Sequence, residues 1–111
     1  MNNIIKDVED LKEKVLNSDE YKDYIKYRTL LDNSVEINEI IDKIKETQQT
    51  IIKNNEIQKN TDKEELELES LYKKLNSYED YTNYINSSKK LNEIITYIQK
   101  EFENYFNKFI I

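Results

Sequence analysis

The chain has 111 residues, a mass of 13.5 kDa and a formal charge of −6, with 17 basic residues against 23 acidic ones. It contains no Gly, Pro, Cys, His or Trp. Tight β-turns and phosphate-binding loops depend on Gly, so this composition argues against β-sandwiches, Rossmann units and P-loops. We therefore predict an all-α protein, and the length suits a single domain over residues 1–111.

The same composition limits the chemistry of the chain. Without Cys or His there is no thiol nucleophile, no histidine base and no usual zinc ligand, so we expect no enzyme activity and no cofactor. The acidic balance argues against direct nucleic-acid binding, which needs Lys and Arg to neutralise phosphates. No apolar run approaches the ~18 residues that cross a bilayer, and no signal-peptide pattern follows Met1. We expect a cytoplasmic protein without membrane insertion.

Five amphipathic helices are predicted from apolar residues that repeat at alternating spacings of three and four. Four of the helices are expected to start at a side-chain N-cap, namely Asn17, Asn33, Thr61 or Ser77, each with an acidic residue three positions later. The polar residues 54–61 form the weakest segment and are predicted to contain a loop. The predicted helices cover 3–16, 18–32, 34–57, 62–75 and 78–109.

The last predicted helix carries the strongest pattern, a seven-residue repeat typical of a coiled coil. At ~32 residues it would be about 48 Å long, whereas a compact domain of this size has a radius of gyration of about 13 Å. We therefore expect an elongated helical bundle or a second chain packed on the protruding ends. One repeat position holds Ser88, which either specifies register or partner choice or simply faces a gap. The two sets of repeat positions are Tyr81, Ser88, Ile95, Phe102 and Phe109, and Tyr84, Leu91, Ile98 and Tyr105.

The C-terminal half of this helix is the predicted protein-interaction surface. Its aromatic and aliphatic side chains would leave a large apolar patch in water, and such patches usually mark association sites. We expect a homodimer or a heterodimer with a paralogue. The predicted interaction residues are Leu91, Ile95, Ile98, Phe102, Tyr105, Phe106 and Phe109.

Two other groups of residues have a structural and a functional interpretation. The acidic residues of 64–69 could bind a metal, but without His and splayed around a helix they are typical of a solvated first turn. The regularly spaced tyrosines suit packing, although phosphorylation or aromatic ligand binding would use the same side chains. The motif Tyr-x-x-Tyr-Ile occurs at 21–25 and again at 81–85, through either a duplicated helical hairpin or a biased composition.

The order of these elements resembles the YlbF/YmcA family of small helical bacterial proteins. The resemblance covers nearly the whole chain and depends on the order and spacing of three segments. These are SDEYKDY at 18–24, NSVEINEII at 33–41 and YINSSKKLNEII at 84–95.

The resemblance implies an all-α, elongated, dimer-forming regulator without enzymatic activity, as in low-GC Gram-positive bacteria and including the YheA-like branch. It further implies partnership with paralogues and a complex linked to the endoribonuclease RNase Y, which affects mRNA processing, competence, sporulation and biofilm formation. Some members carry cysteines associated with iron–sulfur clusters, and this chain has none. The alternative is a structural homo-oligomeric coiled-coil protein, such as a phage or mobile-element component or a holdase-like helical hairpin.

Overall fold

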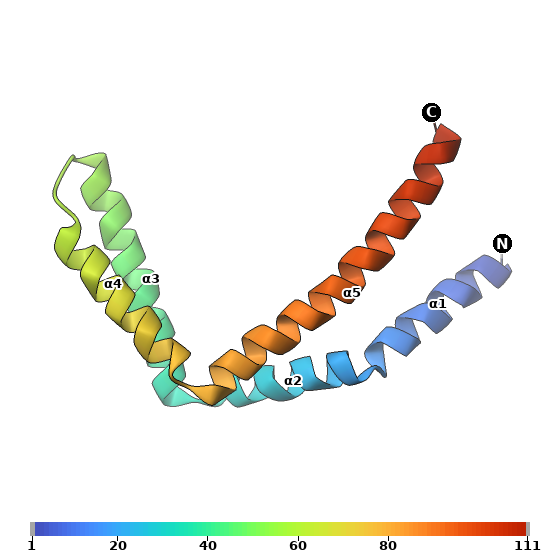
Figure 1. The fold of residues 1–111 in the computed structure, drawn as a ribbon, viewed down its shortest axis with the longest axis horizontal. Coiled ribbons are helices and arrows are strands. Elements are labelled where there is room, and N and C mark those ends of the chain that lie inside the picture. Colours follow the sequence, from blue (N-terminus) through green and yellow to red (C-terminus); the bar gives the residue numbers. More distant parts are fainter. Residues whose placement is uncertain (1, 111) are drawn as a thin grey trace. The chain divides into compact units, whose positions relative to one another are not determined.

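The computed structural model describes the backbone of residues 2–110 and the side chains of residues 2–108. This part of the chain forms five α-helices and no strand (Figure 1). The all-α prediction is confirmed, and each predicted helix boundary lies within one residue of the observed one. The helices are α1 (Asn2–Leu16), α2 (Asp19–Asp32), α3 (Val35–Glu56), α4 (Asp62–Asn76) and α5 (Glu79–Ile110).

The chain divides into two compact units, which we describe separately. The terminal unit contains Met1–Tyr27 and Tyr84–Ile111, and the hairpin unit contains Arg28–Asn83. The division falls inside α2 and inside α5, so each of these helices contributes residues to both units. The assignment of residues 1–111 to one domain stays a prediction.

The core of the hairpin unit lies between α3 and α4, which run side by side (Figure 1). Ile37, Ile40 and Ile44 form one stripe on α3 because their spacings of three and four return to the same helix face. All three are buried, as is Leu75 on α4. Burying an aliphatic side chain of this size stabilises a fold by about 1.5–3 kcal/mol. This stripe is therefore the main source of stability in the unit.

The turn between α3 and α4 places a non-glycine residue in the left-handed backbone region. Gln58 has a φ of 56°, and its N–H donates to the carbonyl of Asn55 at 3.1 Å. The N–H of Lys59 donates to the carbonyl of Asn54 at 2.8 Å. These are the two hydrogen bonds of a Schellman motif, which usually has Gly at the left-handed position. Residues 57–61 lie outside helices, within the segment 54–61 that was predicted to contain a loop.

Two of the four predicted N-caps are wrong by one residue. Ser18 and Ser34, not Asn17 and Asn33, accept the backbone N–H three residues further on, at 3.2 and 3.3 Å. In each Asn–Ser pair the serine hydroxyl lies in the capping position, because the helix begins one residue later than the asparagine would require.

The other two predicted caps act differently. Thr61 precedes α4, but its side chain makes no capping bond and its hydroxyl donates to Glu65 at 3.3 Å. Asn60 instead accepts the backbone N–H two residues further on at 2.8 Å. The hydroxyl of Ser77 donates to the carbonyl of Lys74 at 2.6 Å, so this residue closes α4 and does not open α5.

The terminal unit has its core along the first half of α5. The rings of Tyr24 and Tyr84 lie with their centroids 5.7 Å apart and their planes tilted by 34°. Leu91 and Ser87 are buried, and the Ser87 hydroxyl donates to the carbonyl of Tyr84 at 2.9 Å. Ser88, the polar residue in the predicted repeat, is half-buried. The two copies of the Tyr-x-x-Tyr-Ile motif therefore contact each other.

Candidate functional site

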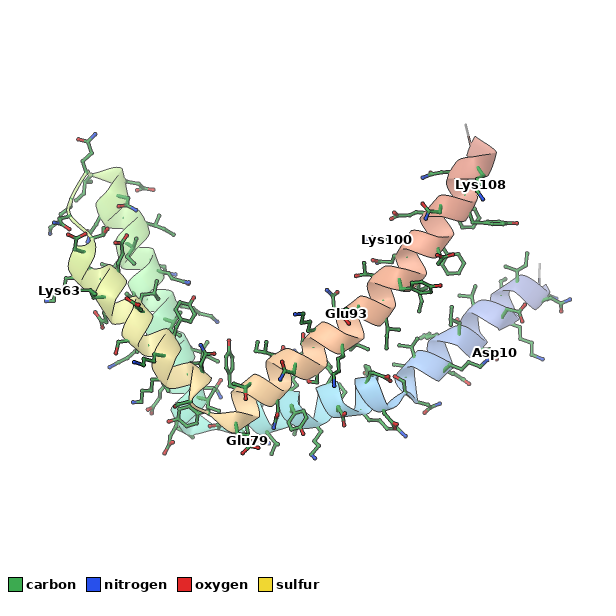
Figure 2. The ribbon with its side chains drawn as sticks, viewed as in Figure 1. Asp10, Lys63, Glu79, Glu93, Lys100 and Lys108 are labelled. Carbon is green, nitrogen blue, oxygen red and sulfur yellow. The ribbon has the colours of Figure 1, made fainter. Side chains whose placement is uncertain are left out.

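The largest group of exposed apolar side chains in the terminal unit lies along α1 and the second half of α5. No residue of α1 is buried. Its apolar stripe starts at Ile4 and Val8, both exposed, and continues through Leu11 and Val15, both half-buried. Asp10 marks α1 and Lys100 marks this part of α5 in Figure 2.

Two apolar grooves lie between these helices. The first, of about 330 Å³, is lined mainly by Val8, Leu11 and Val15 of α1 and by Ile95, Ile98 and Phe102 of α5. The second, of about 500 Å³, adjoins it and shares three of its residues. We call the two together the α1/α5 surface. The residues of the second groove are Leu11, Tyr97, Ile98, Glu101, Phe102, Tyr105 and Phe106.

The aromatic side chains near the end of α5 form a cluster on this surface. Phe102 and Phe106 stack with centroids 6.2 Å apart and planes within 13° of each other. Tyr105 meets Phe106 edge-on at 5.7 Å, with planes 78° apart. Phe102, Tyr105 and Phe106 nevertheless stay 42–58% exposed. Aromatic rings contribute much of the binding energy at protein interfaces when a partner covers them.

The structure separates the predicted interaction residues into three groups. Leu91 is only 7% exposed and belongs to the core of the terminal unit. Ile95, Ile98, Phe102, Tyr105 and Phe106 line the α1/α5 surface. The side chain of Phe109 lies outside the described residues. That these residues bind a partner stays a prediction.

Sequence reasoning missed the half of this surface that belongs to α1. Val8, Leu11, Val15 and Leu16 line the first groove, and Tyr97 lines the second. The α1 stripe is readable in the sequence as a run of spacings of four and three. A stripe alone does not say which helix it faces, so its place opposite α5 emerges only in three dimensions.

A polar pocket of about 420 Å³ lies between α3 and α4 in the hairpin unit. Its lining includes Glu36, Lys43, Lys74 and Tyr78. The phenol of Tyr78 donates to Oε2 of Glu36 at 3.2 Å. Desolvation first, and then the hydrogen bond and negative charge of Glu36, raise the pKa of Tyr78 above its ordinary 10.0. The phenol therefore keeps its proton at neutral pH and acts as a hydrogen-bond donor that ties the link before α5 to the first turn of α3.

The acidic start of α4 has the geometry of a helix first turn. Glu64 is half-buried, and Glu65 accepts the hydroxyl of Thr61. Over the residues with described side chains, no three carboxylates gather closely enough to hold a metal ion. The negative charges lie at the positive end of the helix dipole, where they are stabilising.

The fold and this surface define a small helical protein in which apolar side chains of α1 and of the second half of α5 line two adjoining grooves. The family model described as control of competence regulator ComK, YlbF/YmcA, matches residues 4–105. The chain therefore belongs to the YlbF/YmcA family, a family of competence regulators. The matched range extends from the first turn of α1 to Tyr105 and includes most of the α1/α5 surface.

Two further comparisons complete these findings. A search of curated proteins and a search of solved structures each found no significant match. Among the described residues, no helix combines the length and the apolar character that crossing a membrane requires.

Proposed function

We propose that this chain is a non-enzymatic regulatory protein that acts by binding other helical proteins through the α1/α5 surface. The observation that carries the proposal is the exposure of the aromatic cluster beside the two apolar grooves. Covering apolar area is favourable by about 25 cal/mol for each Å² removed from water. A patch of this kind is therefore a surface that a partner would cover.

The partner is expected to contribute a helix. The grooves extend between two helices, and their walls are mostly aliphatic and aromatic, with Lys12, Gln99 and Glu101 as the charged or amide side chains. An amphipathic helix places apolar side chains at i, i+3, i+4 and i+7, which suits such a long apolar groove. A second copy of the chain or a paralogue would supply a helix of this kind, giving a homodimer or a heterodimer.

The cellular role we propose follows the family. YlbF/YmcA regulators are linked to RNase Y-dependent mRNA processing and thereby to competence, sporulation and biofilm formation. A complex with paralogues and RNase Y is therefore the partner set we expect for this chain. The support for this step is family membership, since a fold alone does not define a function.

A structural homo-oligomer is the second candidate, because the same surface would be covered equally well by identical copies. In that case the chain would associate only with itself. The distinction lies in what is recovered with the protein from its host.

The experiment is a tagged pull-down from the native host, with crosslinking and mass spectrometry. We expect paralogues or RNase Y, crosslinked near the second half of α5. Phe102→Asp should abolish their recovery, because a carboxylate would then lie in the apolar contact. Asn104→Asp introduces the same change of charge at an exposed polar position of α5 and should leave recovery unchanged.

Equal recovery with Phe102→Asp, from a folded variant, would contradict the proposed surface. Recovery of this protein alone would favour the structural homo-oligomer over the regulator.

A further inference from the structure

The two units share one pattern of helix bounds and apolar residues, which becomes visible once the helix bounds are known. α1 covers Asn2–Leu16 and α4 covers Asp62–Asn76, so their ends differ by sixty residues at both termini. Leu11 and Val15 of α1 correspond to Leu71 and Leu75 of α4. α2 and α5 then begin sixty residues apart.

The helices that lie opposite α1 and α4 also correspond to each other in sequence. The segment Asn-Glu-Ile-Ile occurs at 38–41 in α3 and again at 92–95 in α5, and each copy is followed three residues later by another isoleucine, Ile44 or Ile98. α3 packs on α4 in the hairpin unit, and the second half of α5 faces α1 in the terminal unit. Each unit is therefore a pair made of an α4-type helix and an α3-type helix.

The two pairs differ in how fully their matching residues are covered. Ile40 and Ile44 are buried, whereas their counterparts Ile94 and Ile98 are half-buried. Leu75 is 2% exposed, and its counterpart Val15 is half-buried. The same order holds two turns before Leu75, where Leu68 is half-buried and its counterpart is exposed.

The counterpart of Leu68 is Val8, which is 51% exposed and lies at the wall of the 330 Å³ groove. Valine has one methylene fewer than leucine, and the α1 stripe has valine at two positions where α4 has leucine. A stripe of smaller side chains buries less apolar area against the opposite helix, so it packs less tightly and leaves volume between the two helices unfilled. The apolar pattern that closes the α3/α4 pair is nevertheless present in α1.

From this comparison we propose that α1 closes onto the second half of α5 in the same way that α4 packs on α3. The α1/α5 surface therefore alternates between an open and a closed arrangement. Closure brings Val8 and Val15 against Ile98 and Phe102 and removes the first groove. The regulatory consequence rests on the proposed function: in the closed arrangement the chain covers its own association surface.

Thiol reactivity tests closure directly, because the chain has no cysteine and an introduced one is unique. Val8→Cys, Glu9→Cys and Leu68→Cys variants are alkylated with iodoacetamide under native conditions. If nine molecules in ten are closed, only one in ten has an accessible thiol at position 8. We therefore expect Cys at position 8 to react about tenfold more slowly than Cys at the exposed position 9. Its rate should approach that of the Leu68→Cys variant.

A dilution series identifies what covers position 8. Protection that stays constant on dilution is expected for closure by α1 of the same chain. Equal rates at positions 8 and 9, or protection that disappears on dilution, would overturn the proposal, the latter because a second copy would then cover the residue. Circular dichroism verifies that all three variants are folded.

A disulfide lock separates closure from the proposed function. The double variant Lys12→Cys/Gln99→Cys places one thiol on each wall of the first groove and keeps every apolar side chain of the α1/α5 surface. We expect it to form an intramolecular disulfide, and the oxidised protein to lose association that the reduced protein retains. Association that is equal in the two states would overturn the regulatory role of closure. If neither state associates while position 8 is protected, the proposed function fails and closure stands.

Discussion

Gln58 illustrates how a residue adapts to a position that usually belongs to glycine. Among the described residues it alone has a positive φ, of 56°, and it ends α3 with the two hydrogen bonds of a Schellman motif. An L-residue in the left-handed region pays about 1 kcal/mol in steric repulsion at its Cβ atom. The turn is therefore held by the packing of α3 on α4 against a local preference.

Gln58→Gly should relieve this repulsion. We expect the free energy of unfolding to rise by about 0.5–1 kcal/mol, because Gly adopts positive φ at no steric cost. Urea denaturation measures the change as a higher midpoint with an unchanged slope. Gln58→Val is the matched control and should lower the midpoint, since β-branched residues resist positive φ. A lower midpoint for the glycine variant would contradict this interpretation of the turn.

Tyr78 makes the pH dependence of the hairpin unit testable. Its pKa is raised in the folded chain, so ionisation of the phenol is harder there than in the unfolded chain. The stability that this group contributes is fully present below its unfolded pKa of about 10 and is lost as the pH rises through the folded value. Tyr78→Phe has no ionisable phenol and no bond to Glu36.

The measurement is the stability of the wild type relative to Tyr78→Phe between pH 8 and 11. We expect the wild type to lose stability relative to the variant as the pH rises above about 10. The comparison removes the contribution of the other tyrosines, which both proteins share. A stability difference that does not change with pH would show that the Tyr78–Glu36 hydrogen bond is not maintained in solution.

At the scale of helices, the two units should respond differently to the same substitution. Ile37 on α3 is 2% exposed, and Ile95 on α5 is 39% exposed. Ile37→Ala removes buried methyl groups and leaves a cavity, so we expect a loss of about 2–5 kcal/mol. Ile95→Ala should cost about 1 kcal/mol or less, because water already reaches the side chain.

Chemical denaturation of each isoleucine variant at low protein concentration provides this comparison. A similar loss in both would indicate that Ile95 is as fully buried in solution as Ile37, and would contradict its 39% exposure in the structure.

The helices were predictable because apolar periodicity is local information. The stripe through Ile37, Ile40 and Ile44 predicts both the helix and its buried face. The caps were less predictable, since Asn17 and Ser18 are both good capping residues and only the path of the backbone decides between them. The left-handed turn at Gln58 had no signal, because no glycine marks it.

The interaction surface was predictable only in part, for a different reason. A seven-residue repeat shows which side chains share a face, but it does not show what covers that face. Leu91 and Phe102 occupy the same repeat in the sequence, yet the chain itself buries the former and leaves the latter 42% exposed. The contribution of α1 required a long-range pairing that the apolar stripe of α1 does not specify by itself.

At the scale of the whole molecule, the account predicts association through one defined surface. The net charge of −6 argues against nucleic acid as the partner, whereas the α1/α5 surface is an apolar one that suits a protein partner. Family membership indicates a regulator, and the function we propose for it is the binding of other helical proteins. The association state is therefore the property on which the proposed function depends.

Multi-angle light scattering of the wild type, Phe102→Asp and Asn104→Asp tests this claim most directly. If the chain pairs with itself, the wild type and Asn104→Asp should have about twice the 13.5 kDa chain mass. Phe102→Asp should have the mass of one chain and an unchanged helical circular dichroism spectrum. If the chain pairs with a paralogue, the same three results are expected for the mixture of the two proteins. A folded Phe102→Asp variant with the mass of the wild-type complex would contradict the α1/α5 surface as the site of association.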